Sequence, residues 1–475
     1  MKLHIAALAV GLALVPAAAN AAVTFEYLFD NGFPTSISYD GTAIAGNTVG
    51  NYSAFRWTQA TGLMDLGRCA ACEVGTSGGT PGISADGKRV ASTIASSDSQ
   101  FVTSGLWTLG QGWNQIAPPT PSGGKIVDVT MTDVWGSSPD GNAVVGLFYR
   151  NNPGGTAHAY RWRQDTGMVD LGSSGRSSRP GGGATSYNGS VIAGWDESPS
   201  FGYRRPCAWR DTTLYQLGSV PDAIGEARAV STTGEWVVGY EKNADTNTRE
   251  AARWHWDGSA WTTTQFLGSV DGTGVDQGIA VAEAVSADGK LVIGYNSFYG
   301  DPFETTGFIW DETTGTIQDI LFWLADQGID VSPTFDIRDL IAMTPDGRTL
   351  IGYGVETTTN TWRAFRIHYD RPGVTGVAPK SPAPVALQLS ASPNPARSGT
   401  SFTLALPSAG RAEFSLYDAS GRRVRTLLAS DLPAGTHSVK WDGRDDSGAR
   451  VGAGVYFTRL QVGASSTGGK LVVIE

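Results

Sequence analysis

The sequence lacks the features that mark several large functional classes. No stretch is long and apolar enough to cross a bilayer. The formal charge is −10 and no basic stripe offsets it, which argues against a nucleic-acid partner. There is no G-x-S-x-G elbow, no H-E-x-x-H pair and no phosphate-cradling glycine loop. We therefore predict no transmembrane segment, no nucleic-acid partner and no cofactor.

Cysteine is also scarce, with three residues in 475. Cys69 and Cys72 form a C-x-x-C pair, for which a local disulfide is the leading interpretation in an oxidising compartment. Zinc would need four ligands, and there is no second cysteine pair. A redox pair would need a helix N-terminus beside it to lower a thiol pKa, and none is expected there. Cys207 stands alone and is expected to be a buried thiol, so we predict no metal site.

The N-terminus has the pattern of a secretion signal. Met1-Lys2 supplies the positive start, residues 5–15 the apolar core, and Ala19-Asn20-Ala21 the small-x-small cleavage site. We predict a signal peptide over residues 1–21, with cleavage between Ala21 and Ala22. The mature chain is then exported.

What the sequence does contain is a repeat, seen most clearly over residues 226–268. Four short runs there alternate apolar and polar residues, which is typical of strands with one buried face. The predicted strands are residues 226–231, 235–241, 250–256 and 261–268. Each break carries Gly, Asp, Asn or Thr, the residues that turns need. One such four-stranded sheet is marginal alone and must stack on copies of itself.

The copies are marked by a turn of the form Ser/Thr-x-Asp/Asn/Thr-Gly between the first two strands. Its first residues are Ser38, Ser84, Ser138, Ser186, Ser231, Ser286 and Thr344. The second strand usually closes with glycine, at Gly46, Gly146, Gly194, Gly239, Gly294 and Gly352. The third strand carries an anchor at Trp57, Trp107, Trp162, Trp209, Trp254, Trp310 and Ile367. This gives about seven repeats of roughly fifty residues, in the range of propeller blades.

The fourth strands are one short, because the chain stops repeating soon after Ile367. Residues 23–29 precede the first repeat and can supply the missing strand. Pairing the two ends would remove two exposed sheet edges at once. The predicted fold is all-β, a seven-bladed β-propeller over residues 22–372 in which the N-terminal strand completes the last blade. One departure, residues 319–328, has helical spacing and ends in glycine.

The remainder has a different pattern. Residues 373–386 are rich in Pro, Gly, Ala and Val and form a predicted linker. From residue 387 the repeat signature is absent and about seven short strands follow, at residues 387–391, 401–406, 412–417, 423–428, 435–441, 454–462 and 470–474. This density of strands predicts a β-sandwich over residues 387–475.

Resemblances to known families add to this. The repeats resemble the HAF family of bacterial extracellular repeats, through Ala54-Phe55-Arg56-Trp57 with Met64-Asp65-Leu66-Gly67 and the equivalent units of later copies. The form Ser138-Pro139-Asp140-Gly141 is similar to TolB-type propellers. The HAF resemblance covers most of residues 33–368 and implies a secreted, propeller-like protein but no reaction.

The last ninety residues resemble the FlgD-type immunoglobulin-like domain, which overlaps the sorting domains of type IX secretion cargo. The match includes Ser392-Pro393-Asn394-Pro395, Leu416-Tyr417-Asp418 and Gly454-Val455-Tyr456-Phe457. The resemblance implies contact with secretion machinery and a location outside or on the outer surface of a Gram-negative-type cell. The chain ends in Val473-Ile474-Glu475, where many sorting domains end in a basic residue.

Candidate catalytic groups have structural explanations. The recurrent aspartates occupy turns where the side chain bonds its own backbone, and the histidines flanking the third-strand anchors are expected to pack or lie on the surface. The spacing of Asp442, Asp445 and Asp446 fits a hairpin turn better than a calcium loop. We predict no catalytic residue. A polysaccharide hydrolase or lyase nevertheless needs only two well-placed carboxylates, and the central funnel of a propeller could supply them.

The loops between second and third strands do not repeat and should gather on one face of the ring. They carry aromatic residues suited to stacking on sugars or gripping an extended peptide, namely Tyr149, Phe201, Tyr203, Phe298, Tyr299 and Phe303. The aromatics directly after the repeated glycine (Trp195, Tyr240, Tyr295, Tyr353) recur in phase and are expected to pack between blades. The sequence therefore favours a secreted or cell-surface binding module for a glycan or protein ligand. The alternatives are a polysaccharide-active hydrolase or lyase, and a structural surface component.

Overall fold

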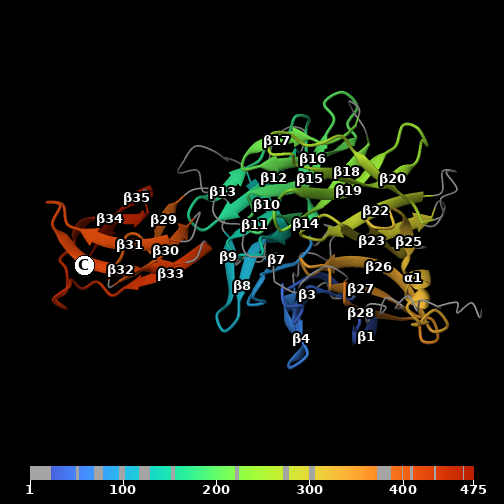
Figure 1. Cartoon of the computed structure of the whole chain (residues 1–475), viewed down its shortest axis with the longest axis horizontal. Helices are drawn as coiled ribbons and strands as arrows, with labels where there is room; N and C mark the ends of the chain where they lie inside the picture. Colours follow the sequence, from blue (N-terminus) through green and yellow to red (C-terminus); the bar gives the residue numbers. More distant parts are fainter. Residues whose placement is uncertain are drawn as a thin grey trace, which may run out of the picture.

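The computed structural model describes residues 23–49, 53–68, 79–95, 102–116, 129–150, 156–219, 224–270, 278–298, 305–371, 387–397, 399–406, 410–432, 435–463 and 465–474. The predicted signal peptide with its Ala21–Ala22 cleavage site, Cys69, Cys72, Tyr299, Phe303 and the whole of the predicted linker lie outside these ranges. Within them the chain is all-β apart from one short helix (Figure 1). No helix of the described part is long and apolar enough to span a membrane.

The repeat over residues 226–268 forms four antiparallel strands, as the pattern predicts. These are β18 (Gly225–Val230), β19 (Trp236–Lys242), β20 (Arg249–His255) and β21 (Gln265–Gly268). They pair in sequence order. The fourth strand starts later than predicted, because Trp261 pairs with Trp256 only as an isolated bridge.

The other repeats follow the same order of strands, and we number them along the chain. Repeat 1 is β2 (Gly32–Ile37), β3 (Ala43–Thr48), β4 (Ser53–Thr58) and β5 (Gly62–Arg68); repeat 2 is β6 (Gly82–Ile83), β7 (Arg89–Ala95), β8 (Val102–Thr108) and β9 (Gly112–Ile116); repeat 3 is β10 (Val129–Ser137), β11 (Ala143–Arg150), β12 (Ala157–Arg163) and β13 (Gly167–Asp170); repeat 4 is β14 (Ser178–Thr185), β15 (Val191–Glu197), β16 (Arg204–Arg210) and β17 (Thr213–Gln216). Repeat 5 is the one above; repeat 6 is β22 (Gly278–Val285), β23 (Leu291–Phe298), β24 (Thr305–Asp311) and β25 (Ile317–Asp319); repeat 7 begins with β26 (Phe335–Met343), β27 (Thr349–Glu356) and β28 (Thr361–Tyr369). Single parallel bridges between β14 and β18 and between β20 and β22 join repeats 4 to 6 into one sheet.

The recurrent turn aspartate holds its own turn together, as predicted. In repeat 1, Ser38 donates from Oγ to Asp40 Oδ1 at 2.6 Å, and the backbone N–H of Thr42 donates to the same oxygen at 3.0 Å. The same pair of bonds recurs at Asp86, Asp140, Asp288 and Asp346. These carboxylates therefore serve the turns rather than a reaction.

The turns also join neighbouring repeats. Backbone N–H groups of Tyr39 and Ala85 donate to the carbonyls of Ala85 and Pro139, at 3.1 Å and 2.6 Å. An arginine beside the third-strand anchor reaches the turn-glycine carbonyl of the next repeat; these pairs are Arg56–Gly87, Arg161–Gly189, Arg210–Gly234 and Arg253–Gly289. Such guanidinium-to-carbonyl bonds set the stacking of one repeat on the next.

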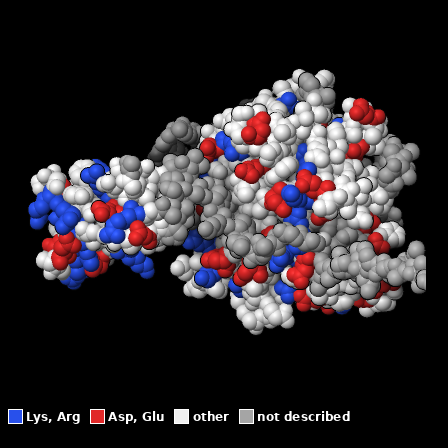
Figure 2. Space-filling model, in the orientation of Figure 1, with Lys and Arg blue, Asp and Glu red and all other residues white. Residues whose placement is uncertain are grey.

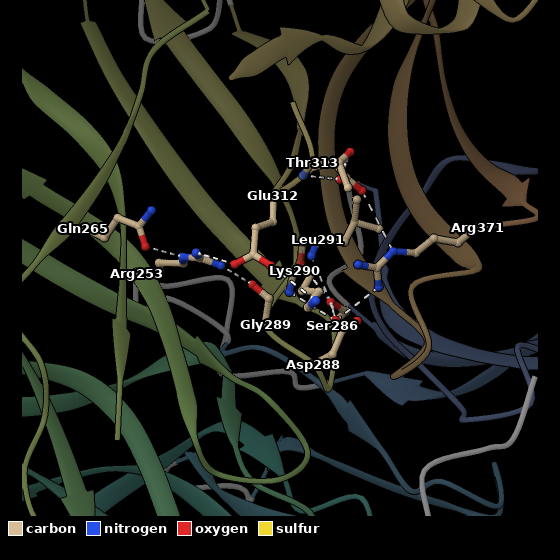
Figure 3. Close-up of polar contacts among 11 residues, drawn as sticks. Arg253, Gln265, Ser286, Asp288, Gly289, Lys290, Leu291, Glu312, Thr313 and Arg371 are labelled. Carbon is tan, nitrogen blue, oxygen red and sulfur yellow. Dashed lines mark hydrogen bonds and ion pairs between the residues drawn. The ribbon is translucent and has the colours of Figure 1, made fainter. Parts of the chain in front are cut away.

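Figure 3 shows this arrangement where repeats 5, 6 and 7 meet. Arg253 donates to the Gly289 carbonyl at 2.5 Å and to Gln265 at 2.8 Å, and pairs with Glu312 at 3.0 Å. Arg371, which follows β28, reaches back to Asp288 in the turn of repeat 6 at 3.2 Å. The arginine that ends the repeat region is thus anchored in the preceding repeat.

The N-terminal strand completes repeat 7, as predicted. β1 (Val23–Asp30) pairs antiparallel with β28, from Val23 opposite Tyr369 to Asp30 opposite Arg363. The first and last repeats also share a core, in which Ile351 packs with Ile37, Ile44, Phe55 and Trp57. The two ends of the repeat region therefore lie together.

The predicted helix is present as α1 (Ile320–Asp326). Asp319 caps it by accepting from the backbone N–H of Leu321 at 2.8 Å, and Gly328 follows with φ +82°. Ile320, Trp323 and Leu324 are buried against repeats 6 and 7, whereas Phe322 is 75% exposed.

Residues 387–474 form two sheets around their own core. One sheet contains β29 (Gln388–Ser392), β30 (Thr400–Leu406) and β33 (Gly435–Trp441); the other contains β32 (Arg423–Leu432), β31 (Gly410–Tyr417), β34 (Gly454–Val462) and β35 (Ser465–Val473). Phe402, Leu404, Phe414, Leu416 and Leu460 are fully buried between them. The last strand starts five residues earlier than predicted, because it pairs residue for residue with β34 in a hairpin.

Candidate functional site

Two of the predicted binding aromatics, Phe201 and Tyr203, form a stacked pair in the loop between β15 and β16. Their ring centroids are 5.5 Å apart and the rings are 4° from parallel. Phe201 is 68% exposed. Because Tyr203 covers one face of Phe201, the exposed surface of Phe201 is available as an apolar platform of about the size of a sugar ring.

Hydrogen bonds fix the conformation of this loop. The N–H of Ser198 donates to the carbonyl of Tyr203 at 2.8 Å, and the N–H of Gly202 donates to the carbonyl of Ser198 at 3.1 Å. Ser198 Oγ accepts from the N–H of Phe201 at 3.3 Å. Gly202 has φ +72°, which favours glycine. The aromatic pair is therefore presented by a formed turn.

Other predicted binding residues lie elsewhere. Tyr149 is in strand β11 rather than in a loop, half-buried against Trp135, Leu147 and Ala157. Its burial raises the pKa of its hydroxyl. Phe298 is the last residue of β23 and is half-buried. The placement of Tyr149 as a loop residue was wrong, because β11 continues past the repeated glycine and buries this ring.

Arg204, the first residue of β16, links the aromatic loop to the interior. It faces Glu197 across the β15–β16 pair. Its side chain is 53% exposed, yet it forms an ion pair with Glu226, whose side chain is only 5% exposed. Its guanidinium also lies over the ring of Trp195, 4.7 Å from the centroid. Arg204 is thus half exposed to solvent while its guanidinium contacts a buried carboxylate of repeat 5.

Those first strands carry a set of residues at one register, five positions before the turn Ser or Thr. The members are Phe33, Gly79, Asp133, Glu226, Val281 and Asp339. In repeat 4 the equivalent residue is Arg179, which lies seven positions before the turn because β14 has two additional residues. Where the first and second strands pair at this position, the first-strand residue lies opposite the residue that follows the repeated glycine. Glu226 lies opposite Tyr240 and Asp339 lies opposite Tyr353. We call these the inner positions.

The inner positions explain the repeated glycine. A Cβ atom on Gly239 would lie 2.0 Å from the carbonyl oxygen of Glu226, and one on Gly352 would lie 2.0 Å from that of Asp339. The same clash, at 1.8–2.2 Å, would arise at Gly46, Gly146, Gly194 and Gly294. The second strand can approach the first this closely only because it lacks a side chain there.

An ionic network connects the first strands of repeats 4, 5 and 6. Arg228 pairs with Glu283 at 2.7 Å and with Glu226 at 3.5 Å, and Arg179 pairs with Glu226 at 3.5 Å. Burial opposes ionisation of Glu226, but Arg228, Arg179 and Arg204 together hold its pKa below the usual value. Both glutamates are therefore compensated charges.

Two inner aspartates differ from these glutamates. Asp133 is 0% exposed, and neither carboxylate oxygen has a hydrogen-bond partner among the described residues. Burial raises its pKa to about 7, with Arg179 opposing this shift. Burial, and next the charge of Glu283, raise the pKa of Asp339 far above the usual value. The Tyr353 hydroxyl donates to Asp339 at 3.4 Å. The carboxyl groups of Asp339 and Glu283 therefore differ, because burial disfavours the charged form of Asp339 whereas Glu283 pairs with Arg228.

Arginine also stacks on tryptophan beside this network. The Arg179 guanidinium lies 3.8 Å from the ring centroid of Trp135 and 5.7 Å from that of Trp195. Both indole N–H groups are buried without a partner among the described residues. Of the aromatics expected to pack between repeats, Tyr353 does so most clearly, since its ring contacts Phe33 of repeat 1 at 5.0 Å.

The remaining candidates have structural partners. His158 Nδ1 lies 3.0 Å from Asp170 on the neighbouring strand, and His255 packs on Trp236 at 4.3 Å. Cys207 is a buried free thiol on β16, as predicted. In the described ranges no three His, Cys, Asp or Glu side chains are grouped to hold a metal ion.

The loop aromatics were predicted from the sequence, whereas the inner charges were not. A signal was available for three of them, since Asp133, Glu226 and Asp339 each occur five positions before the first residue of the turn. They were overlooked because charged residues scattered through apolar strands look like solvent-facing positions when each strand is considered alone.

Comparison with known proteins identifies one family. The FlgD Ig-like domain model matches residues 392–468. A search of curated proteins gives no match for this chain. Among solved structures, the chain is similar to the β-propeller domain of the Trilobed protease from Pyrococcus furiosus, with 12% identity, a TM-score of 0.42, and coverage of 70% of this chain and 94% of that one.

Two further similar structures are the TolB protein of Acinetobacter baumannii and a puromycin hydrolase. For TolB the identity is 18% and the TM-score 0.33, over 50% of this chain and 56% of that one. For the hydrolase the identity is 11% and the TM-score 0.45, over 78% of this chain and 58% of that one. Similarity at this level gives no information about the activity of this chain.

Proposed function

We propose that the protein is an exported binding module, built from a seven-bladed propeller over residues 22–372 and an immunoglobulin-like domain over residues 387–475. The propeller proposal is supported by the pairing of β1 with β28 and by the core shared between the first and last repeats. The two sheets around one core, together with the family match, support the immunoglobulin-like domain. Residues 373–386 connect them as a linker.

The observation that carries the binding function is the exposed Phe201–Tyr203 pair on a formed turn. Single exposed rings such as Phe322 are common on protein surfaces, but Phe201 belongs to a stacked pair that hydrogen bonds of the loop hold in place. On the face shown in Figure 2, acidic and basic side chains are interspersed rather than gathered in one basic patch, which fits a glycan or protein ligand better than nucleic acid.

The test is binding of the purified full chain to a glycan array and to extracts of cell-surface proteins. Phe201→Ala should remove binding that the wild type shows. Phe322→Ala is the matched control, because Phe322 is 75% exposed but lies on α1. Equal binding by both variants and the wild type would contradict the assignment of binding to the Phe201–Tyr203 pair, and absence of binding by the wild type to every glycan and protein would contradict the binding function itself.

The C-terminal domain is assigned to sorting or surface attachment outside a Gram-negative-type cell, with the type IX machinery as partner. The match to the FlgD Ig-like domain supports this. A truncation after residue 386 tests it, with the expectation that the protein is retained inside the cell. Unchanged delivery of the truncated chain to the cell surface would rule the assignment out.

A second candidate function is a polysaccharide hydrolase or lyase. The observation in its favour is Asp339, a buried carboxyl whose pKa is raised far above the usual value by burial and by the charge of Glu283, as a general acid requires. Glu283 and Asp339 are nearly completely buried, at 2% and 4% exposure, and Glu283 is engaged by Arg228. Release of reducing or unsaturated ends from a bound polysaccharide, lost in Asp339→Asn, would establish this function.

A further inference from the structure

Resting on the proposed binding function, we propose that Phe201, Arg204 and Glu197 form a subsite for one neutral pyranose ring of a polysaccharide. The three residues come from the end of β15, the following loop and the start of β16. The loop hydrogen bonds already hold the platform in place, so little conformational entropy is lost when a ligand binds.

The apolar part of the subsite is the open side of the Phe201 ring. Tyr203 supports the ring from the other side in a nearly parallel stack. The C–H face of a pyranose is flat and apolar, and it packs on an aromatic face of this kind. A lone exposed ring without support would present no fixed surface.

The polar part consists of Glu197 and Arg204, which flank the loop that carries Phe201 in the sequence. Arg204 and Glu197 face each other across β15 and β16. Glu197 Oε1 lies 3.5 Å from the position that a Cβ on Gly202 would occupy, so it borders the loop. A guanidinium donates and a carboxylate accepts, and adjacent sugar hydroxyls can satisfy both at once.

The charge of the surroundings favours a neutral ring over a uronate. Arg204 is already paired with Glu226, and Glu197 adds a negative charge beside it. The neighbouring arginines Arg179, Arg205 and Arg228 are paired with Glu226, Asp196 and Glu283. These ion pairs weaken the attraction that the three guanidinium groups would otherwise exert on an acidic sugar.

Affinity electrophoresis of the full chain tests this, with soluble neutral polysaccharides (a β-glucan, a xylan and a mannan) and two acidic ones (alginate and polygalacturonate) in the gel. We expect retardation by at least one neutral polysaccharide, unchanged in 0.5 M NaCl, and at least tenfold weaker binding by Phe201→Ala and Arg204→Gln. Phe322→Ala should bind as the wild type does.

The possible results separate the subsite from the broader function. Binding to a neutral polysaccharide that is the same in Phe201→Ala would overturn the subsite and leave the binding module standing. Retardation by the acidic polymers alone, abolished by salt, would overturn the neutral specificity. Absence of retardation by every polymer would overturn the subsite, whereas the binding module is overturned only if the glycan array and the cell-surface proteins also give no binding. Matching circular dichroism spectra and melting temperatures show that the variants are folded.

Discussion

Arg366 in β28 donates from Nη1 to the carbonyl oxygen of Gly41, in the first turn of the repeat region, at 3.1 Å. The two residues are 325 positions apart in the sequence. The same contact is made between consecutive repeats by Arg56, Arg161, Arg210 and Arg253. Arg366 makes it between the last repeat and the first. The last repeat therefore meets the first through the same interaction as any other neighbouring pair.

Removing this contact should destabilise the repeat region. We expect Arg366→Ala to lower the free energy of unfolding by about 1–2 kcal/mol, because the Gly41 carbonyl loses a charged donor and Glu26 loses its ion pair. Urea denaturation of the full chain measures this. Lys88→Ala, which removes an exposed 4.0 Å pair with Asp86, should change stability by less than about 0.5 kcal/mol.

The repeated glycine provides a sharper steric test. Gly239→Ala should cost at least about 3 kcal/mol or prevent folding, because its Cβ would lie 2.0 Å from the Glu226 carbonyl oxygen and backbone must move. Gly182→Ala is the control, since its nearest neighbour would be Thr80 at 3.7 Å. Thermal unfolding of the two variants should differ clearly. Equal melting temperatures would show that the strands do not approach as closely as described.

The ionic network predicts that replacing one arginine strongly lowers the free energy of unfolding. Arg228→Met should destabilise the chain by about 3–5 kcal/mol, because it leaves the buried Glu283 without its guanidinium. Adding Glu283→Gln to this variant should restore part of the loss, since the uncompensated charge is then gone. A double variant no more stable than Arg228→Met alone would argue against this pairing.

Asp133 predicts a pH dependence of stability. Its pKa is raised to about 7 in the folded chain, against about 4 in an unfolded one. Between these values the folded chain binds more protons than the unfolded chain, so stability falls as pH rises from about 4 to about 7. Asp133→Asn removes this fall, and relative to the wild type it should gain stability between pH 4 and pH 8.

Asp40→Asn is the control variant, for which the change of stability with pH should have the opposite sign. Burial raises the pKa of Asp40, but hydrogen bonds from Ser38 and Thr42 outweigh burial and leave it lowered. Its contribution is present above the unfolded pKa of about 4 and is lost as pH falls through the lower folded pKa, so this variant should lose stability relative to the wild type as pH rises toward about 4. Urea midpoints across pH measure both variants. Parallel curves for Asp133→Asn and the wild type would contradict the assignment.

Much of this architecture was predictable because the strand and turn pattern recurs along the repeat region. The turn residues Ser38 and Asp40, the closing Gly46 and the anchor Trp57 recur in phase, so weak local patterns reinforce one another. The N-terminal strand was found by counting, since a missing fourth strand needs a partner. Tyr149 could not be placed, because nothing in its own sequence shows where β11 ends. The ionic network was missed because Arg228 and Glu283 meet only after separate repeats pack together.

The most direct test of the account combines binding and turnover on one sample. Isothermal titration of the full chain with the polysaccharide that retards it, followed by assay of the same mixture for new reducing or unsaturated ends, separates a binder from an enzyme. The account predicts heat of binding, at least tenfold weaker affinity in Phe201→Ala, and no new chain ends. Release of chain ends, or binding that is unaffected by Phe201→Ala, would contradict it.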